Sequence, residues 1–442
     1  MHSTQAKGHR PEDPPPVPDR SVRLLSERPP CRGGPADEGL DGCSAPAADA
    51  DAVDAHTVDA DVARAVERQL DTLLAERVAR AGDLDPGFAR ELAEPVSRFT
   101  RHGGKRIRPR FLWWTLRACD GGDGPRVTAA LRIGAALELL QTCALVHDDV
   151  MDGARTRRGR PALHVEAAAR GPADGTRPAR DFGAAVAILA GDLALVWADD
   201  VVAETALPPA VAGTVRGLWR SLRTEMVAGQ YLDLHGQAMS LCSPARALRA
   251  ACLKSARYSV ERPMALGAAL AGADDATLRA LCSAGRCVGT AFQLRDDLDD
   301  VFADPRRTGK PGGGDIRAGK PTYLVAVART AAEAAGDRRA LRVLDDCVGR
   351  ADLGEEDLDR VREVLIATGA RSTVETRIGR LTAHGLRRLA AVPLEPYAAG
   401  RLADLMRAVS GADPGGGPDP ARCGDGAAPG SRRAGDGGVS GR

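Results

Sequence analysis

A long apolar segment that runs directly into a cluster of aspartates limits the folds open to this chain. The segment 131–146 is apolar nearly all round a helix, which is typical of a central buried helix and not of a surface one. Asp148, Asp149 and Asp152 follow it in the sequence Asp-Asp-Val-Met-Asp (DDxxD). Because a helix advances 3.6 residues per turn, Asp148 and Asp152 share one face. Carboxylates crowded at the end of a buried helix repel one another, so this pattern predicts cations that neutralise them.

A second aspartate cluster with the same spacing lies further along the chain. Asp296, Asp297 and Asp300 belong to the sequence Asp-Asp-Leu-Asp-Asp, at the end of another apolar periodic segment. Oxygen ligands on a rigid spacing suit Mg²⁺, which keeps several waters and shares its coordination shell with phosphate oxygens. One acidic cluster is a weak signal, because most acidic runs are solvated surface. Two clusters, each embedded in apolar sequence, indicate a diphosphate site with several metal ions.

The rest of the sequence is patterned for helices, with almost no strand signal. Apolar residues recur at i, i+3, i+4 and i+7, and aromatic residues make up only 3% of the chain. We therefore predict an all-α fold, a single large antiparallel helix bundle. The predicted helices cover residues 62–80, 127–150, 183–203, 211–234, 244–270, 275–301, 320–335 and 373–391.

The two ends of the chain are poor in core-forming residues. Of the 442 residues, 1–57 are rich in Pro, Gly, Asp and Ala, and 411–442 are mostly Gly, Asp, Arg, Pro and Ser. Neither stretch can bury enough apolar surface to offset the entropy lost on ordering, so we expect both to be disordered. Residues 58–410 are enough for one large helical domain.

Charge and cysteine content limit the partners and the location. The formal net charge of +1 argues against binding nucleic acid through a general basic field. No signal peptide is recognisable, and charges break the apolar runs before about 18 residues, so we expect no transmembrane segment. The ten cysteines form no CxxC pair and no Cys/His cluster. This usage is typical of a reduced, cytoplasmic protein without zinc.

Two basic segments are suited to the phosphates that metal ions would bridge to the aspartates. Arg157 and Arg158 lie in an arginine-rich segment after the first cluster, and planar guanidinium groups suit phosphate oxygens. A surface salt-bridge cluster is the alternative reading of these arginines. Lys105, Arg106 and Arg108 follow two glycines, and a Gly-rich helix start with basic side chains can bind diphosphate without metal.

The order of these motifs resembles the trans-isoprenyl diphosphate synthases (the polyprenyl synthetase family), over about residues 95–325. The resemblance implies the isoprenoid synthase fold, a helix bundle around a central cavity, and a homodimer. The matching motifs are Gly-Gly-Lys-Arg-Ile-Arg-Pro at 103–109, Gln141, the first DDxxD, Arg-Arg-Gly-Arg-Pro at 157–161, Ala-Gly-Asp at 190–192, Gly-Gln at 229–230, Lys-Ser at 254–255, Phe-Gln-Leu-Arg at 292–295, the second DDxxD, Thr-Gly-Lys at 308–310, Asp-Ile at 315–316 and Gly-Lys at 319–320.

The resemblance also implies a magnesium site between the two clusters. About three Mg²⁺ ions per active site would hold an allylic diphosphate. Their ligands would be Asp148, Asp149, Asp152, Asp296, Asp297 and Asp300. The residues that contact the allylic diphosphate, and that carry catalysis with the aspartates, would be Arg157, Lys254 and Lys310.

Isopentenyl diphosphate would bind beside the allylic diphosphate, on Lys105, Arg108, Gln141 and Arg158. The substrate-binding residues that complete the two sites would be Ser255, Gln293 and Lys320.

The implied activity is condensation of isopentenyl diphosphate with dimethylallyl, geranyl or farnesyl diphosphate to a longer all-trans polyprenyl diphosphate. The allylic group ionises, the double bond of isopentenyl diphosphate attacks the cation, and a proton is lost to the released diphosphate. Positive charge at the site would stabilise the departing diphosphate. The Gly-rich segment 308–320 would form a lid that excludes water.

The residues one turn before the first cluster predict the length of the product. If the prenyl chain grows down between the helices, Cys143 and Ala144 line the top of its tunnel, and both are small. Short-product members of the family commonly place an aromatic residue there. Geranylgeranyl diphosphate is therefore the predicted product, with farnesyl or longer diphosphates as alternatives. Trp197 or the region of Leu189 are candidates for the floor of the tunnel.

Two other functions are compatible with an aspartate-rich helix bundle. A class I terpene cyclase also uses DDxxD, but its second metal motif usually contains Asn, Ser or Thr, and Glu. A non-catalytic prenyltransferase subunit typically lacks aspartates in one cluster, whereas both are complete here. Incubation of the purified protein alone with Mg²⁺ and both substrates separates the three.

Overall fold

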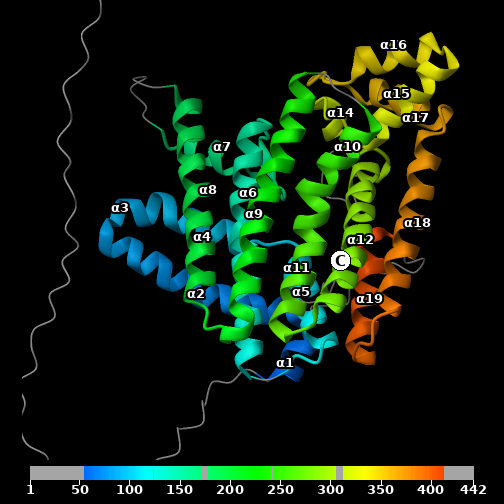
Figure 1. The fold of residues 1–442 in the computed structure, drawn as a ribbon. Coiled ribbons are helices and arrows are strands. Elements are labelled where there is room, and N and C mark those ends of the chain that lie inside the picture. Colours follow the sequence, from blue (N-terminus) through cyan, green and yellow to red (C-terminus); the bar gives the residue numbers. More distant parts are fainter. Residues whose placement is uncertain (1–53, 123, 172–177, 240–242, 305–311, 413–442) are drawn as a thin grey trace, which may run out of the picture. The chain divides into compact units, whose positions relative to one another are not determined.

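The computed structural model describes residues 54–122, 124–171, 178–239, 243–304 and 312–412 (Figure 1). Most of these residues are helical, and the fold is all-α as predicted. The elements of the first half are α1 (Ala55–Ala60), α2 (Val62–Leu84), α3 (Pro86–Phe88), the π-helix η1 (Ala89–Ala93), α4 (Glu94–Arg101), α5 (Ile107–Ala118), α6 (Gly124–Met151), β1 (Thr156–Arg157), β2 (Arg160–Pro161), α7 (Leu163–Ala168) and α8 (Ala179–Glu204).

The second half has the same character. Its elements are α9 (Pro209–Ala238), α10 (Pro244–Ala251), the π-helix η2 (Cys252–Glu261), α11 (Arg262–Ala271), α12 (Asp275–Phe302), α14 (Gly314–Arg317), α15 (Tyr323–Ala335), α16 (Arg338–Cys347), α17 (Glu355–Ala367), α18 (Ala370–Ala390) and α19 (Pro396–Ser410).

The described part of the bundle runs from Ala55 to Ser410. Its first helix begins slightly before residue 58, because the Asp54 side chain accepts a hydrogen bond from the Thr57 amide and caps α1. Its last helix ends at Ser410, where Gly411 takes a left-handed conformation with φ of 67°. Residues 1–53 and 413–442 lie outside the described part of the chain, so the disorder of the two ends stays a prediction.

The first acidic cluster is carried by the central helix of the bundle. α6 packs most extensively against α8, and it also contacts α5 and α2. It is the one described helix that is long and apolar enough to cross a membrane by length and composition, but 78% of that apolar window is buried inside the protein. Arg132 and Glu138 interrupt the apolar run of α6, as expected, and its apolar residues form the core of the bundle.

The segment predicted as one helix from 244 to 270 contains a π-helix. α10, η2 and α11 follow one another without a break, and the ten residues of η2 have the wider π turn. Two glycines allow neighbouring helices to approach this stretch. A Cβ at Gly229 on α9 would lie 2.2 Å from the Lys254 amide nitrogen, and a Cβ at Gly289 on α12 would lie 2.4 Å from the Ala256 carbonyl oxygen. π-turns are frequent at functional sites, and η2 carries Lys254 and Ser255.

Candidate active site

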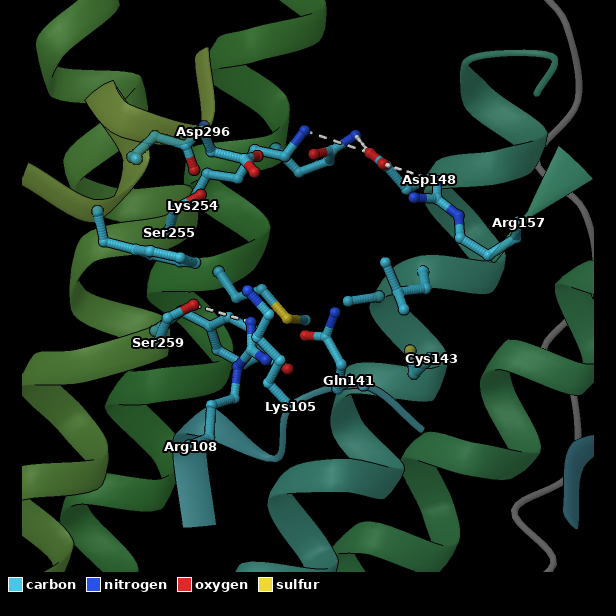
Figure 2. A pocket seen from close by; sticks show the side chains of 18 of the residues that line it. Lys105, Arg108, Gln141, Cys143, Asp148, Arg157, Lys254, Ser255, Ser259 and Asp296 are labelled. Carbon is cyan, nitrogen blue, oxygen red and sulfur yellow. Dashed lines mark hydrogen bonds and ion pairs between the residues drawn. The ribbon is translucent and has the colours of Figure 1, made fainter. Parts of the chain in front are cut away.

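A cavity of about 3190 Å³ contains nearly all of the predicted site residues. It is lined by parts of α6, α9, η2 and α12, and its polar side chains gather in two places (Figure 2). We call the first place the acidic end; it consists of Asp148, Asp152, Asp233, Asp296, Asp297, Asp300 and Asp315. We call the second place the basic end; it consists of Lys105, Arg108, Gln141 and Arg158.

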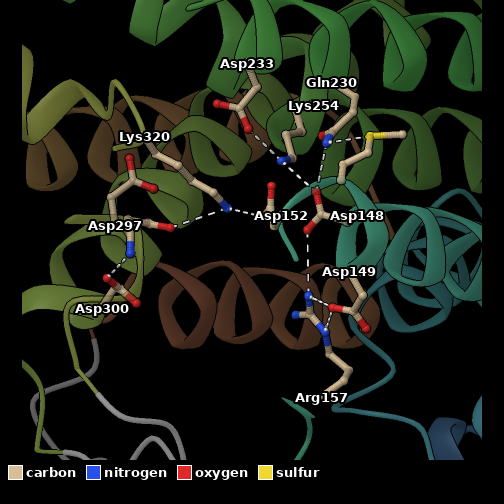
Figure 3. A network of polar contacts seen from close by, with 12 residues as sticks. Asp148, Asp149, Asp152, Arg157, Gln230, Asp233, Lys254, Asp297, Asp300 and Lys320 are labelled. Carbon is tan, nitrogen blue, oxygen red and sulfur yellow. Dashed lines mark hydrogen bonds and ion pairs between the residues drawn. The ribbon is translucent and has the colours of Figure 1, made fainter. Parts of the chain in front are cut away.

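Asp148 and Asp152 form one wall of the acidic end, at the C-terminal end of α6 (Figure 3). The Lys254 ammonium lies 3.2 Å from Asp148 Oδ1, and the Gln230 side-chain amide donates to the same oxygen at 2.9 Å. Lys320 Nζ lies 2.9 Å from Asp152 Oδ2. Burial alone would raise the pKa of Asp148, but Lys254 and Lys320 outweigh it and hold that pKa below its usual value. This wall is therefore anionic and already paired with lysines.

Asp149, predicted as a metal ligand, does not line the cavity. Its side chain is buried, and the Arg157 Nε donates to its Oδ1 at 2.8 Å. The reason is helical geometry, since Asp149 is rotated about 100° from Asp148 around α6. Arg157 itself lies on β1, which pairs antiparallel with β2 in a short hairpin. The turn between the two strands has positive φ angles at Arg158 and Gly159. The structure thus places Asp149 as the buried partner of an arginine that lines the cavity.

The opposite wall carries carboxylates that are poorly neutralised. Burial raises the pKa of Asp297 well above its usual range, and repulsion from Asp315 adds to the effect. The same two causes raise the pKa of Asp300 to about 6. The Gln293 amide donates to Asp297 at 2.7 Å, and the Asp315 backbone amide donates to Asp300 at 2.9 Å. Such a group of buried carboxylates is suited to bind additional cations.

Two aspartates of the acidic end were missing from the predicted site. Asp233 lies 2.8 Å from Lys254 Nζ, and Asp315 lies 3.5 Å from Lys320 Nζ. Asp233 could have been found from the sequence, because it follows Gln230 by three residues and therefore lies on the same face of α9. Asp315 was noted only as part of a motif, and its place beside the second cluster depends on the tertiary fold.

The described Asp, Glu, His and Cys side chains contain no group of three that is ready to hold a metal ion. The lysine contacts explain this, because Lys254 binds both Asp148 and Asp233, and Lys320 lies between Asp152 and Asp315. Mg²⁺ needs few protein ligands when waters and substrate phosphates fill its coordination shell. The donor set fits that ion, provided that the lysines release the carboxylates to it and turn toward phosphate.

The basic end lies where the loop that contains Gly103 and Gly104 (the Gly-Gly loop) meets α6 and η2. Arg108, in the first turn of α5, donates to the Ser259 hydroxyl at 2.8 Å, and its guanidinium lies 4.3 Å from the centre of the Tyr258 ring. Gln141 Oε1 is buried and has no hydrogen-bond partner within the described residues. The side chain of Lys105 is exposed to the cavity. The contacts of Arg108 with Tyr258 and Ser259 were not predicted from the sequence.

The remaining predicted site residues either line the cavity or lie outside the described part of the chain. Ser255 on η2 and Gln293 on α12 line the cavity, and Arg158 donates to the His102 carbonyl at 2.6 Å. Lys310 lies outside the described residues. The predicted lid begins there too, so neither its closure nor the role of Lys310 is tested.

The candidate residues for product length lie on two sides of the cavity. Cys143 and Ala144 line it from α6, as predicted. Trp197 is buried in the core and Leu189 is exposed on the surface, and neither lines the cavity. The side chains that face it from α8 and α9 are instead Leu195 and Met226. Trp197 and Leu189, the two candidates for the floor, therefore lie outside the cavity lining.

Residues 89–365 match the profile of the polyprenyl synthetase family. The chain belongs to that family. It is accordingly a prenyltransferase that forms trans-prenyl diphosphates, on the all-α isoprenoid synthase fold.

Relatives within the polyprenyl synthetase family have products of different length. The (2E,6E)-farnesyl diphosphate synthase of Mycobacterium tuberculosis is 29% identical over 327 residues, which cover 73% of this chain and 83% of the relative. The nonaprenyl diphosphate synthase of the same organism is 32% identical over 272 residues, 62% of this chain and 70% of the relative. The geranylgeranyl pyrophosphate synthase of Corynebacterium glutamicum, solved with isoprenyl diphosphate and magnesium, has 35% identity and a TM-score of 0.74, covering 78% of this chain and 97% of that one.

Proposed function

We propose that this chain is a Mg²⁺-dependent synthase that condenses isopentenyl diphosphate with dimethylallyl, geranyl or farnesyl diphosphate, and that its main product is geranylgeranyl diphosphate. The observation that carries the proposal is one cavity with an acidic end for a metal-bound diphosphate and a basic end for a second diphosphate. Two diphosphate sites in one cavity are what a condensation needs, because both substrates must be bound together.

The acidic end supports binding of about three Mg²⁺ ions. Asp148 and Asp152 would hold metal from one wall, and Asp296 and Asp300 from the other. When bound, the metal ions would withdraw charge from the departing diphosphate of the allylic substrate. Arg157 and Lys254 line the same end and would contact that diphosphate, and Lys310 of the undescribed segment would do the same.

The basic end supports binding of isopentenyl diphosphate. Lys105 and Arg108 would bind its two phosphates, with Gln141 and Arg158 beside them. Arg108 is held in place by Tyr258 and Ser259, so its guanidinium needs little reorganisation when the substrate binds. No side-chain base is required in this scheme, because the released diphosphate takes the proton of the condensation.

The decisive experiment is incubation of the purified full-length chain with isopentenyl diphosphate, each allylic diphosphate and Mg²⁺, with and without EDTA. We expect elongated prenyl diphosphate, mainly of the geranylgeranyl length, in the reactions without EDTA and no product in those with EDTA. A cyclic hydrocarbon would identify a cyclase, and no turnover with Mg²⁺ would identify a non-catalytic subunit. Either result would refute the proposal.

Ala144→Phe is expected to shorten the product. The side chain at this position lines the cavity one turn before Asp148, so a phenyl ring would fill the path of the growing chain. Chromatography of the products from identical reactions should show a shift from geranylgeranyl toward farnesyl or geranyl diphosphate. Ala203→Phe, on the exposed end of α8, is the matched control and should leave the product unchanged. An unchanged product from Ala144→Phe would disprove the tunnel assignment.

We further propose a homodimer that buries the outer faces of α8 and α9. Large apolar side chains are exposed on α8, namely Ile188, Leu189 and Val196, and α9 adds Val227 and Tyr231, which also border the cavity. An apolar surface of this kind is typical of a protein interface.

Val196→Glu is expected to convert this homodimer to a monomer, because it places a charge in the apolar interface. Light scattering should give twice the 46.2 kDa chain mass for the wild type and the single chain mass for the variant. Thr376→Glu, on the exposed side of α18, should remain dimeric. A monomeric wild type would contradict the dimer.

A further inference from the structure

Arg106 is a buried arginine in a backbone conformation that its residue type rarely adopts. It precedes α5 with φ of 48° and ψ of 40°, in the left-handed region. Only 1% of its side chain is exposed, although Lys105 next to it is exposed. A non-glycine residue persists in this region only where the surroundings hold it there. The contacts of its guanidinium identify what holds it.

The Arg106 guanidinium joins the end of α4 to the middle of α6. Nη1 donates to Glu138 Oε2 at 2.6 Å, and Nη1 and Nη2 both lie 3.2 Å from the Thr100 carbonyl oxygen. Nη2 also donates to the Arg101 carbonyl at 3.1 Å. These carbonyls are the last two of α4, where a cation satisfies free acceptors and complements the helix dipole. The Arg106 side chain therefore connects the loop that contains Gly103 and Gly104 both to α4 and to α6.

Gly103 is part of the same arrangement. A Cβ at this position would lie 1.9 Å from the Arg106 guanidinium carbon, so only glycine leaves room for that group. At Gly104 the nearest side-chain atom to such a Cβ is 3.6 Å away. Of the two glycines of the loop, the first thus leaves room for the guanidinium in the position where its hydrogen bonds hold it.

Glu138 connects this arginine to the helix that carries the rest of the site. It is 5% exposed and lies on α6, three residues before Gln141 and ten before Asp148. A buried ion pair contributes little net stability, because desolvation offsets most of the attraction. Stability alone therefore does not account for an Arg106–Glu138 pair at this place, where Arg106 lies directly between Lys105 and Arg108 in the chain.

We propose that Arg106 and Glu138 form a positioning pair, which sets the affinity of the basic end for isopentenyl diphosphate. The pair holds Lys105 and Arg108 at a fixed distance from Gln141, and neither member of the pair contacts the substrate itself. This inference rests on the proposed function, because it assumes that the basic end binds isopentenyl diphosphate. Breaking the pair should weaken that site selectively and leave the allylic site at the acidic end intact.

The first test is Arg106→Met, assayed with both substrates varied separately. We expect KM for isopentenyl diphosphate to rise about tenfold, because a small displacement of a binding group has effects of this size. KM for the allylic diphosphate should change less than about threefold. Glu67→Gln is the matched control, because Glu67 is a half-exposed carboxylate 3.4 Å from the same guanidinium, and its loss should change neither KM.

A second control separates positioning from loss of stability. Arg77→Met removes another buried arginine, paired with Glu204 at 2.7 Å and remote from the basic end, so it should lower Tm without a selective rise in KM for isopentenyl diphosphate. The double variant Arg106→Met/Glu138→Leu replaces the pair by apolar side chains and should recover Tm. Its KM for isopentenyl diphosphate should stay raised, because the contacts with Thr100 and Arg101 are still absent.

Calorimetric titration with isopentenyl diphosphate completes the experiment. A wild-type chain that neither binds it nor turns over refutes the proposed function. A wild-type chain that binds it, together with an Arg106→Met or double variant of unchanged Kd, refutes the positioning pair alone. A selective rise in Kd for both variants supports it.

Discussion

Asp152→Asn is expected to reduce kcat by about a thousandfold, which corresponds to about 4 kcal/mol of transition-state stabilisation. The carboxylate lines the acidic end and is paired with Lys320, so its loss removes a metal ligand of the proposed site and releases a lysine next to it. The shape of the side chain is retained, and the Tm should therefore change little. Steady-state assays at saturating Mg²⁺ and both substrates measure the effect.

Asp299→Asn is the internal control for this experiment. Asp299 belongs to the second cluster and lines the cavity, but half of its side chain is exposed and it lies 4.0 Å from Arg295. We expect kcat to stay within about threefold of the wild type, as for other exposed carboxylates. Equal losses in the two variants would mean that total negative charge matters and not the position of Asp152.

Asp149→Asn is expected to destabilise the protein, since it leaves a partly buried guanidinium without its main partner. Breaking a buried ion pair costs about 3 kcal/mol, which lowers Tm by about 5 °C in a domain of this size. Arg157 should then be less well held, so KM for the allylic diphosphate should also rise. Differential scanning calorimetry and steady-state kinetics measure the two effects.

Asp192→Asn provides the comparison, because it removes an equal charge from an exposed side chain on α8. Its Tm should shift by less than about 1 °C. If Asp149→Asn kept the wild-type Tm and lost as much kcat as Asp152→Asn, then Asp149 would be a metal ligand after all, and its pair with Arg157 would be incidental.

The sequence was sufficient for the fold and for most of the site because both depend on local patterns. Helical periodicity located α6 and α12, and the spacing of the aspartates put Asp148 and Asp152 on one face. It could not show that Asp149 pairs with Arg157, because that contact depends on the hairpin that brings Arg157 back to α6. The π-helix was also missed, because its wider turn has no hydrophobic periodicity of its own and the close approach of Gly229 and Gly289 to it is a tertiary contact.

The candidates for the floor of the tunnel lie outside the cavity lining for a related reason. Trp197 and Leu189 are on the right helix, but the face of α8 that meets the cavity is fixed by how α8 packs on α6. That packing depends on Gly191, where a Cβ would lie 2.1 Å from the His147 ring. Which face of α8 meets the cavity can therefore be known only from the packing of α8 against α6.

Lys254 and Lys320 are, in effect, counterions that belong to the chain. Each lies between carboxylates of different helices or loops, so the two walls attract one another even without a foreign cation. If Mg²⁺ and diphosphate bind as proposed, the carboxylates of Asp148 and Asp152 would hold the metal, and Lys254 and Lys320 would be free to contact phosphate. Asp148 and Asp152 would therefore keep a cationic partner both in the free enzyme and in the substrate complex.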